Sequence, residues 1–128
     1  MSKFERFEIP YPKTKAGQKQ WAKDYGLNAY YAGKHWAARK KDAEFWHTMV
    51  RACMGVHGVR LTPFKRPVTI VFRWNDNLDI DNHAAMGKMI VDAMKGRVIE
   101  DDSRRWVKGV CQYYHDEDYI EVVVKEIT

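Results

Sequence analysis

The feature that most constrains the fold is a change of hydrophobic period along the chain. Between Pro67 and Trp74 every second side chain is large and apolar, and this period of two predicts a strand with one buried face. From Asp81 to Lys95 apolar residues recur at three- and four-residue spacing, which predicts a helix that Gly96 ends. A strand followed by an amphipathic helix predicts a layered fold in which helices cover a sheet.

Three more strands and one more long helix are expected elsewhere. Phe4–Ile9 predicts a short strand, ended by the turn Pro10-Tyr11-Pro12, and His35–Met54 predicts a helix. Residues 13–32 are rich in lysine and glycine and are expected to be a long loop with some helix. The order β-α-β-α-β-β predicts an α+β fold, a mixed β-sheet with two main helices on one face, in a single domain over residues 1–128. The last two strands, expected as a hairpin, cover roughly 104–114 and 118–127.

Length and composition exclude several classes of protein. The chain has 128 residues, about the size of one domain, and no apolar run approaches the length of a membrane-spanning helix. Its first residues lack the apolar stretch of a signal peptide, so we expect a cytoplasmic protein. The distant cysteines Cys53 and Cys111 are expected to be reduced and partly buried. The sequence has no zinc-type Cys/His spacing, phosphate-binding loop, dinucleotide fingerprint or GxSxG motif.

The charge of the chain points to a polyanionic partner. The formal net charge is +5 and the isoelectric point is about 9.2, which makes nucleic acid the default candidate. Charge alone is equally compatible with a generic basic surface. Its distribution is more informative, because acids gather at 76–81, 100–102 and 116–118, away from the basic residues. These basic residues flank an aromatic cluster and comprise Lys13, Lys15, Lys19, Lys23, Lys34, Arg39, Lys40 and Lys41.

A group of acids and one lysine carries the predicted chemistry. Asp79-Ile80-Asp81-Asn82 lies where the strand ends and the helix begins, followed by Lys88, Asp92 and the turn Asp101-Asp102. On a helix, residues seven and eleven apart lie nearly above one another, so Asp81, Lys88 and Asp92 are expected on one stripe. Mg²⁺ binds one or two carboxylates, keeps water and phosphate oxygens as other ligands, and activates water for phosphodiester hydrolysis. The pattern therefore predicts a Mg²⁺ site.

Each part of this pattern also has a purely structural interpretation. Asp79 or Asp81 is a good helix N-cap, favoured there by the helix dipole. Asp101-Asp102 is typical of a turn. Lys88 and Asp92, four residues apart, are typical of a surface ion pair worth under about 1 kcal/mol. The catalytic hypothesis rests on the four elements together.

A second cluster combines aromatic and basic residues, as nucleic-acid-binding surfaces do. Cations hold phosphates, and aromatic rings stack on unpaired bases. In the alternative interpretation, Tyr31 packs against the core and Lys34 is merely solvated; Trp36 is expected in the core. The residues predicted to contact DNA are Asn28, Tyr31, Lys34, His35, Arg39 and Lys40.

The spacing Asp79-x-Asp81-Asn82, Lys88-x-x-x-Asp92-x-Met94, Gly96 and Asp101-Asp102 resembles the signature of the RusA family of Holliday junction resolvases. The resemblance is specific over residues 79–102 and extends loosely to both ends. It implies a RusA-like fold, a homodimer, Mg²⁺ with Mn²⁺ as substitute, cleavage of four-way DNA junctions, and a phage or prophage origin. It maps the catalytic and metal-binding acids onto Asp79, Asp81 and Asp102, with Asp101 as a further metal ligand, and the catalytic lysine onto Lys88. In the family pattern this lysine follows the asparagine by three residues, whereas here it follows by six.

Two other functions remain open from the sequence. One is a non-catalytic basic module that binds nucleic acid, with its aspartates serving as caps and turns. The other is a metal-dependent nuclease of broader range that cuts flaps or other branches. Mg²⁺-dependent cleavage distinguishes a resolvase from the non-catalytic module. A comparison of junction with duplex substrates distinguishes a resolvase from the broader nuclease.

Overall fold

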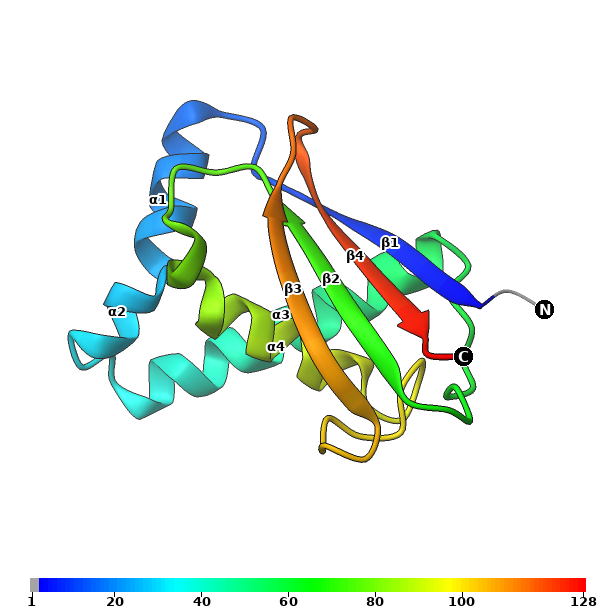
Figure 1. Cartoon of the computed structure of the whole chain (residues 1–128). Helices are drawn as coiled ribbons and strands as arrows, with labels where there is room; N and C mark the ends of the chain where they lie inside the picture. Colours follow the sequence, from blue (N-terminus) through cyan, green and yellow to red (C-terminus); the bar gives the residue numbers. More distant parts are fainter. Residues whose placement is uncertain (1–2) are drawn as a thin grey trace.

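The computed structural model describes residues 3–128 and contains one four-stranded sheet with helices (Figure 1). The elements in chain order are β1 (Phe4–Pro10), α1 (Lys15–Tyr25), α2 (Leu27–Tyr31), α3 (Trp36–Val56), β2 (Val68–Trp74), the short 3-10 helix η1 (Ile80–His83), α4 (Ala84–Met94), β3 (Val107–Tyr114) and β4 (Tyr119–Glu126).

The sheet is mixed, with the strand order β1-β4-β2-β3. β4 is antiparallel to both neighbours, β1 and β2, while β3 is parallel to β2. In the register, Ile70 of β2 lies opposite Val124 of β4 and Val110 of β3. The predicted α+β class with a mixed sheet is confirmed.

The last two strands do not form the expected hairpin. β3 and β4 are consecutive in sequence, but β2 lies between them and bonds to both. β3 begins at Val107 rather than near 104, because a turn in which the amide of Trp106 donates to the carbonyl of Ser103 precedes it. The edges of the sheet are therefore β1 and β3, and the terminal strand β4 is internal.

Two helices occupy much of the segment expected to be a loop. Thr14 caps α1, with its hydroxyl accepting a hydrogen bond from the amide of Gly17 at 2.9 Å. Neither α1 nor α2 contains a fully buried residue, so neither leaves a strong apolar stripe in the sequence. The long helix α3 and the helix α4 agree closely with the two predicted main helices.

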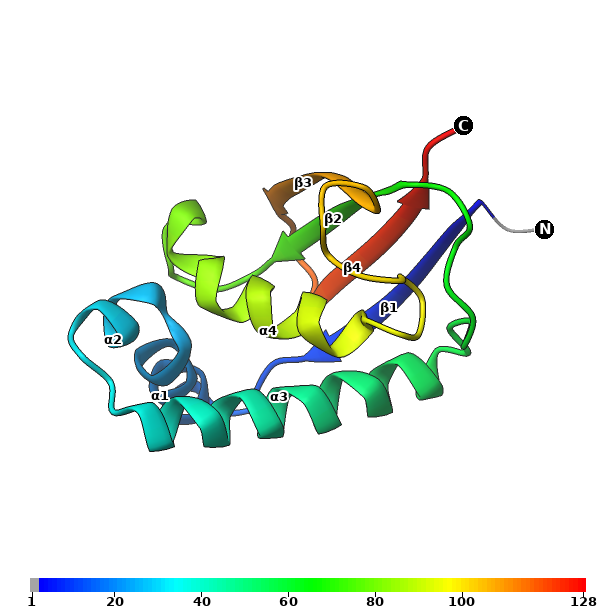
Figure 2. The ribbon, with the colours of Figure 1, turned by 90° about the horizontal axis from the view of Figure 1, so that it is seen from below.

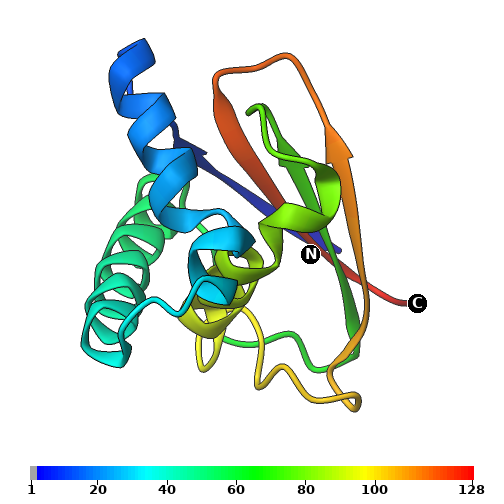
Figure 3. The ribbon, with the colours of Figure 1, turned by 90° about the vertical axis from the view of Figure 1, so that its left-hand side faces the viewer.

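The core lies between the inner face of the sheet and two helices. Figures 2 and 3 both place α4 between the sheet and α3. All four alternate positions of β2, from Val68 to Trp74, are buried, as the period of two predicted. Three residues of α3 and five of α4 complete this layer: Trp46, Val50, Met54, Met86, Met89, Ile90, Ala93 and Met94.

Trp36, which was expected in the core, and Val110 are both exposed. Trp36 is 71% exposed, because it begins α3 at a point where no other element covers the helix. Val110 is 50% exposed although it faces the same side as buried Ile70, because β3 is an edge strand. Cys53 is partly buried as expected, whereas Cys111 is exposed on β3; both are free thiols.

The outer face of the sheet carries a charged network in place of a helix. The carboxylate of Glu121 on β4 accepts hydrogen bonds from Arg6 Nη2 at 2.8 Å and from Arg73 Nη1 at 2.5 Å. Burial by itself raises the pKa of the Glu121 carboxyl, but the two arginines outweigh it and hold that pKa below its usual value. The network ties β1, β4 and β2 together on this face. None of the helices among residues 3–128 has the length and hydropathy required to cross a membrane.

Candidate active site

The candidate site is built on residues 75–83, here called the acidic segment, which leads from the end of β2 through η1 into α4. Asp79 occupies the position before η1, but its side chain makes no capping hydrogen bond. Residues 80–83 form a 3-10 turn rather than α-helix, so the stripe predicted for Asp81, Lys88 and Asp92 does not run continuously from α4. Asp79 is thus the residue at the N-cap position of η1, as the capping interpretation predicted, but its side chain does not cap the helix.

Asp79 and Asp81 are exposed at the end of the sheet, and neither carboxylate has a hydrogen-bond or salt-bridge partner within residues 3–128. The negative charges of both aspartates affect the hydroxyl of Tyr114, the last residue of β3. This hydroxyl donates a hydrogen bond to the carbonyl of Leu78. The pKa of Tyr114 is raised, first by burial of its hydroxyl and then by the negative charges of Asp76, Asp79 and Asp81. The fold thus concentrates negative charge at this point.

A buried network holds the acidic segment in place. His83 is fully buried, and its Nε2 donates to the carboxylate of Asp76 at 2.8 and 3.0 Å. The imidazole stacks on Trp74, with ring centroids 4.3 Å apart. Asp76 also accepts from the hydroxyl of Tyr11 at 2.8 Å and from the amide of Leu78 at 3.0 Å. The bond from Asp76 to His83 bridges the two ends of the segment, so it limits how far Asp79 and Asp81 can move.

Asp102 has a different partner from the other two predicted aspartates. Its carboxylate accepts from Lys95 Nζ at 3.1 Å, and Lys95 also bonds Asp92 at 3.0 Å. Lys95 lowers the pKa of Asp102 through this hydrogen bond, and the two aspartates raise the pKa of Lys95. Lys88 lies 3.3 Å from Asp92, which confirms the predicted pair four residues apart. Asp101 is exposed in the neighbouring turn.

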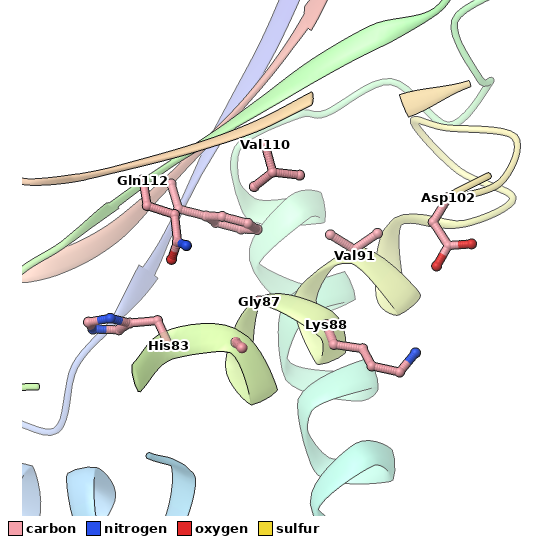
Figure 4. Close-up of a pocket in the computed structure, with 9 residues that line it drawn as sticks. His83, Gly87, Lys88, Val91, Asp102, Val110 and Gln112 are labelled. Carbon is pink, nitrogen blue, oxygen red and sulfur yellow. The ribbon is translucent and has the colours of Figure 1, made fainter. Parts of the chain in front are cut away.

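A pocket of about 260 Å³ between α4 and β3 brings Lys88 and Asp102 to one surface. Its floor is apolar and its rim is polar. Figure 4 shows Lys88 and Asp102 at one end and His83 and Gln112 at the other. The lining residues are Phe72, His83, Ala84, Gly87, Lys88, Val91, Asp102, Val110 and Gln112. The pocket therefore joins Asp102 and Lys88 to the end of the acidic segment, at the buried His83.

The predicted metal site is only partly assembled. Within residues 3–128, no three His, Cys, Asp or Glu side chains converge as a metal-binding group. Asp79 and Asp81 nevertheless offer two carboxylates without partners, and Mg²⁺ requires no more from a protein when water and phosphate complete its octahedral shell. The residues fit a two-carboxylate Mg²⁺ site, while Asp102 stays with Lys95.

The predicted DNA-contact residues divide into two groups. Lys34 is a structural residue, because its ammonium bonds Asp42 at 2.5 Å and the carbonyl of Asp24 at 2.9 Å and lies over the rings of Tyr25 and Tyr30. Its side chain is only 18% exposed, so it is not free to hold a phosphate.

The other predicted contacts form an exposed cluster where α2 meets α3. Tyr31 is 79% exposed, and His35 and Lys40 are exposed beside Trp36. His35 Nδ1 accepts from the amide of Ala37 and caps α3. The remaining members are Arg39, which is exposed and donates to the carbonyl of Tyr30, and Asn28.

This cluster is connected to the acidic segment. The amide of Asn28 donates to Asn82 Oδ1 at 3.2 Å, and α2 packs against both η1 and α4. Gly26 allows the close approach, since a Cβ at that position would lie 2.8 Å from the carbonyl of Ala22 and 3.2 Å from Leu78. The aromatic and basic residues and the two free aspartates therefore belong to one continuous surface.

Several residues of the site carry no sequence signal. The fold brings a hydrogen-bond or ion-pair partner to each of four residues: Asp76, His83, Lys95 and Tyr114. Of these, Asp76 does belong to the acidic run at 76–81. Comparison of the chain with protein-family models and with curated proteins gave no match.

Proposed function

We propose that this protein is a Mg²⁺-dependent endodeoxyribonuclease that cleaves branched DNA, four-way junctions above all, and that it belongs with the RusA-like resolvases. One observation carries the proposal. Within residues 3–128, Asp79 and Asp81 are exposed, and neither side chain has a partner or makes a capping hydrogen bond, yet a buried network holds the segment that carries them. Like charges two residues apart repel one another, so two carboxylates without a bonded partner favour a cation ligand.

The chain's own residues have distinct roles in this proposal. Asp79 and Asp81 would hold Mg²⁺, which supplies an activated water and neutralises charge on the scissile phosphate. Lys88, which lines the pocket, would steady that phosphate. Asp102 keeps a negative charge near Lys88 and is available as a further ligand on release from Lys95. Tyr31, His35, Arg39 and Lys40 would bind the DNA beside the site.

The decisive experiment incubates labelled synthetic four-way junction with the protein, with and without Mg²⁺, and with a matched duplex. We expect Mg²⁺-dependent cutting of the junction, with Mn²⁺ able to substitute. Asp79→Asn and Asp81→Asn should abolish cleavage but keep junction binding, because asparagine preserves shape and removes charge. Asp116→Asn, an exposed acid in the turn before β4, is the matched control and should cut normally.

The alternatives predict other outcomes. Binding without cleavage in any divalent metal would favour a non-catalytic nucleic-acid-binding module. Equal cutting of flaps, other branches and junctions would favour a nuclease of broader range. Full cleavage by both aspartate variants would refute the assignment of the site.

We further propose that the active species is a homodimer. Resolution of a four-way junction requires paired cuts in two strands, and each chain offers one acidic segment. Light scattering of the complex with junction DNA should give the mass of the DNA plus twice the 15.1 kDa mass of one chain. One chain per junction would favour a simpler branch nuclease. Action on DNA also makes the cytoplasm the proposed location.

A further inference from the structure

A second cavity lies on the other side of the acidic segment and has no role in the site described above. It measures about 680 Å³, within the range of cavities that hold small ligands. One wall is α1, and the other is formed by residues 75–77 and Asp118. The two walls are far apart in sequence, and α1 has no buried residue.

The chemistry of this cleft is that of a nucleotide site. Lys15 and Lys19, one turn apart on α1, are exposed on its wall and form no salt bridge within residues 3–128. Trp21 supplies an aromatic wall, supported edge-on by Tyr11 with ring centroids 4.9 Å apart. Cations hold phosphates, and bases stack on aromatic surfaces.

The cleft also offers polar groups for the edge of a base. The amide side chain of Asn77 is exposed in it and makes no hydrogen bond within the described part of the chain. Gln18 donates its amide NH₂ to the carbonyl of Pro12 at 3.0 Å, which leaves its own carbonyl oxygen free. A cleft of about 680 Å³ has room for one nucleotide but not for the paired and stacked bases of a duplex.

We propose that this cleft binds one unpaired nucleotide of the DNA substrate, with its base against Trp21 and its phosphate on Lys15 and Lys19. The inference rests on the proposed function and deepens it, because it names how the protein distinguishes branched from duplex DNA. Asp76 lines the cleft and also belongs to the network that holds Asp79 and Asp81. A nucleotide captured there would place the adjoining strand at the acidic segment.

The test compares two double variants that remove the same charge from the same segment. Lys15→Ala/Lys19→Ala removes the lysines that line the cleft, and Lys13→Ala/Lys23→Ala removes two exposed lysines that do not. Within residues 3–128 none of these four side chains has a hydrogen-bond or salt-bridge partner, so both variants should fold. Binding is measured without divalent metal, so that no cleavage occurs. The probes are a four-way junction with the fluorescent base 2-aminopurine at the branch point, and a duplex of equal length.

We expect Lys15→Ala/Lys19→Ala to weaken junction binding at least about tenfold more than duplex binding. It should flatten the salt dependence by about 0.7 in slope, since the two lysines share one phosphate and each phosphate contact on a single strand contributes about 0.7. The change in 2-aminopurine emission seen with the wild type should disappear. The variant Lys13→Ala/Lys23→Ala should keep that change in emission. Equal losses in the two variants, or equal losses on junction and duplex, would overturn the proposal.

Two further arms separate the remaining outcomes. Cleavage of the junction by the wild type is followed in parallel with Mg²⁺. If the wild type never cleaves the junction, the proposed function fails. The two double variants are then compared on a single strand containing 2-aminopurine, and this comparison tests nucleotide binding in the cleft independently of cleavage. Deoxyadenosine monophosphate is added as a competitor. If it displaces DNA at a lower concentration than an unlabelled single strand does, the cleft is a site for free nucleotides and the proposal is overturned.

Discussion

Replacing Asp76 by alanine tests the buried network behind the acidic segment. The substitution removes the acceptor for His83 Nε2 and for the Tyr11 hydroxyl, while His83 is fully buried and Tyr11 is 8% exposed. Breaking a buried pair by removing one partner costs about 3–5 kcal/mol, because the remaining group keeps its desolvation penalty. We therefore expect Asp76→Ala to lower the free energy of unfolding by about 3–5 kcal/mol.

The neighbouring acid Asp79 provides the matched control. It lies three residues away on the same segment but is exposed, and its side chain has no partner in the part of the chain that the structure describes. Asp79→Ala should change the free energy of unfolding by less than about 0.5 kcal/mol, since it removes no contact. Two aspartates in one short segment are thus expected to differ about tenfold in their effect on stability.

Urea unfolding at pH 7, followed by tryptophan fluorescence, measures both variants against the wild type. A loss of 3–5 kcal/mol corresponds to a fall in melting temperature of about 10–20 °C for a domain of this size. His83→Gln completes a double-mutant cycle with Asp76→Ala, and the two losses should be far from additive. A cost below about 1 kcal/mol for Asp76→Ala, or full additivity with His83→Gln, would refute the buried network.

Three other predictions follow from ion pairs in the structure. Lys34→Ala should lower the free energy of unfolding by about 1–3 kcal/mol, because it removes the cation that pairs with the partly buried Asp42 and leaves that carboxylate only the Tyr30 hydroxyl. Lys40→Ala should leave the free energy of unfolding unchanged, and chemical unfolding compares the two. The pKa of Glu121 is lowered in the folded state, so its stabilising contribution is present at neutral pH and is lost as pH falls below about 4. The stability difference between wild type and Glu121→Gln should therefore shrink in acid, and a difference independent of pH would contradict this. Lys95→Met should raise the pKa of Asp102, which NMR titration of that carboxyl would detect.

The sequence alone predicted the elements whose side-chain periods are imposed by burial. The alternation in β2 and the apolar stripe of α4 were correct because these elements bury one face against the same core. α1 and α2 were expected only as some helix within a long loop, and their extent was not predicted, because they bury no residue completely and leave no apolar period to detect. Local capping by Thr14, rather than burial, marks where α1 begins.

The sequence did not show which strands pair with one another or which side chains become partners. A period of two indicates that β3 and β4 are strands, but it does not distinguish a hairpin from a sheet in which β2 lies between them. Likewise, Lys34 has the composition of a phosphate contact, and only the fold brings Asp42 to it and removes it from solvent. Trp36 is apolar enough for a core but lies at a helix end that nothing covers.

For the candidate site, local spacing identified Asp79, Asp81 and the pair of Lys88 with Asp92, because these relations involve residues close in the chain. The tertiary structure decided the rest. It joined Asp102 to Lys95, placed Asp76 against His83, and set Tyr114 of β3 beside the acidic segment. A hydrogen bond or ion pair forms only where backbone paths bring two groups within about 3 Å, and those paths are fixed by packing across the whole domain.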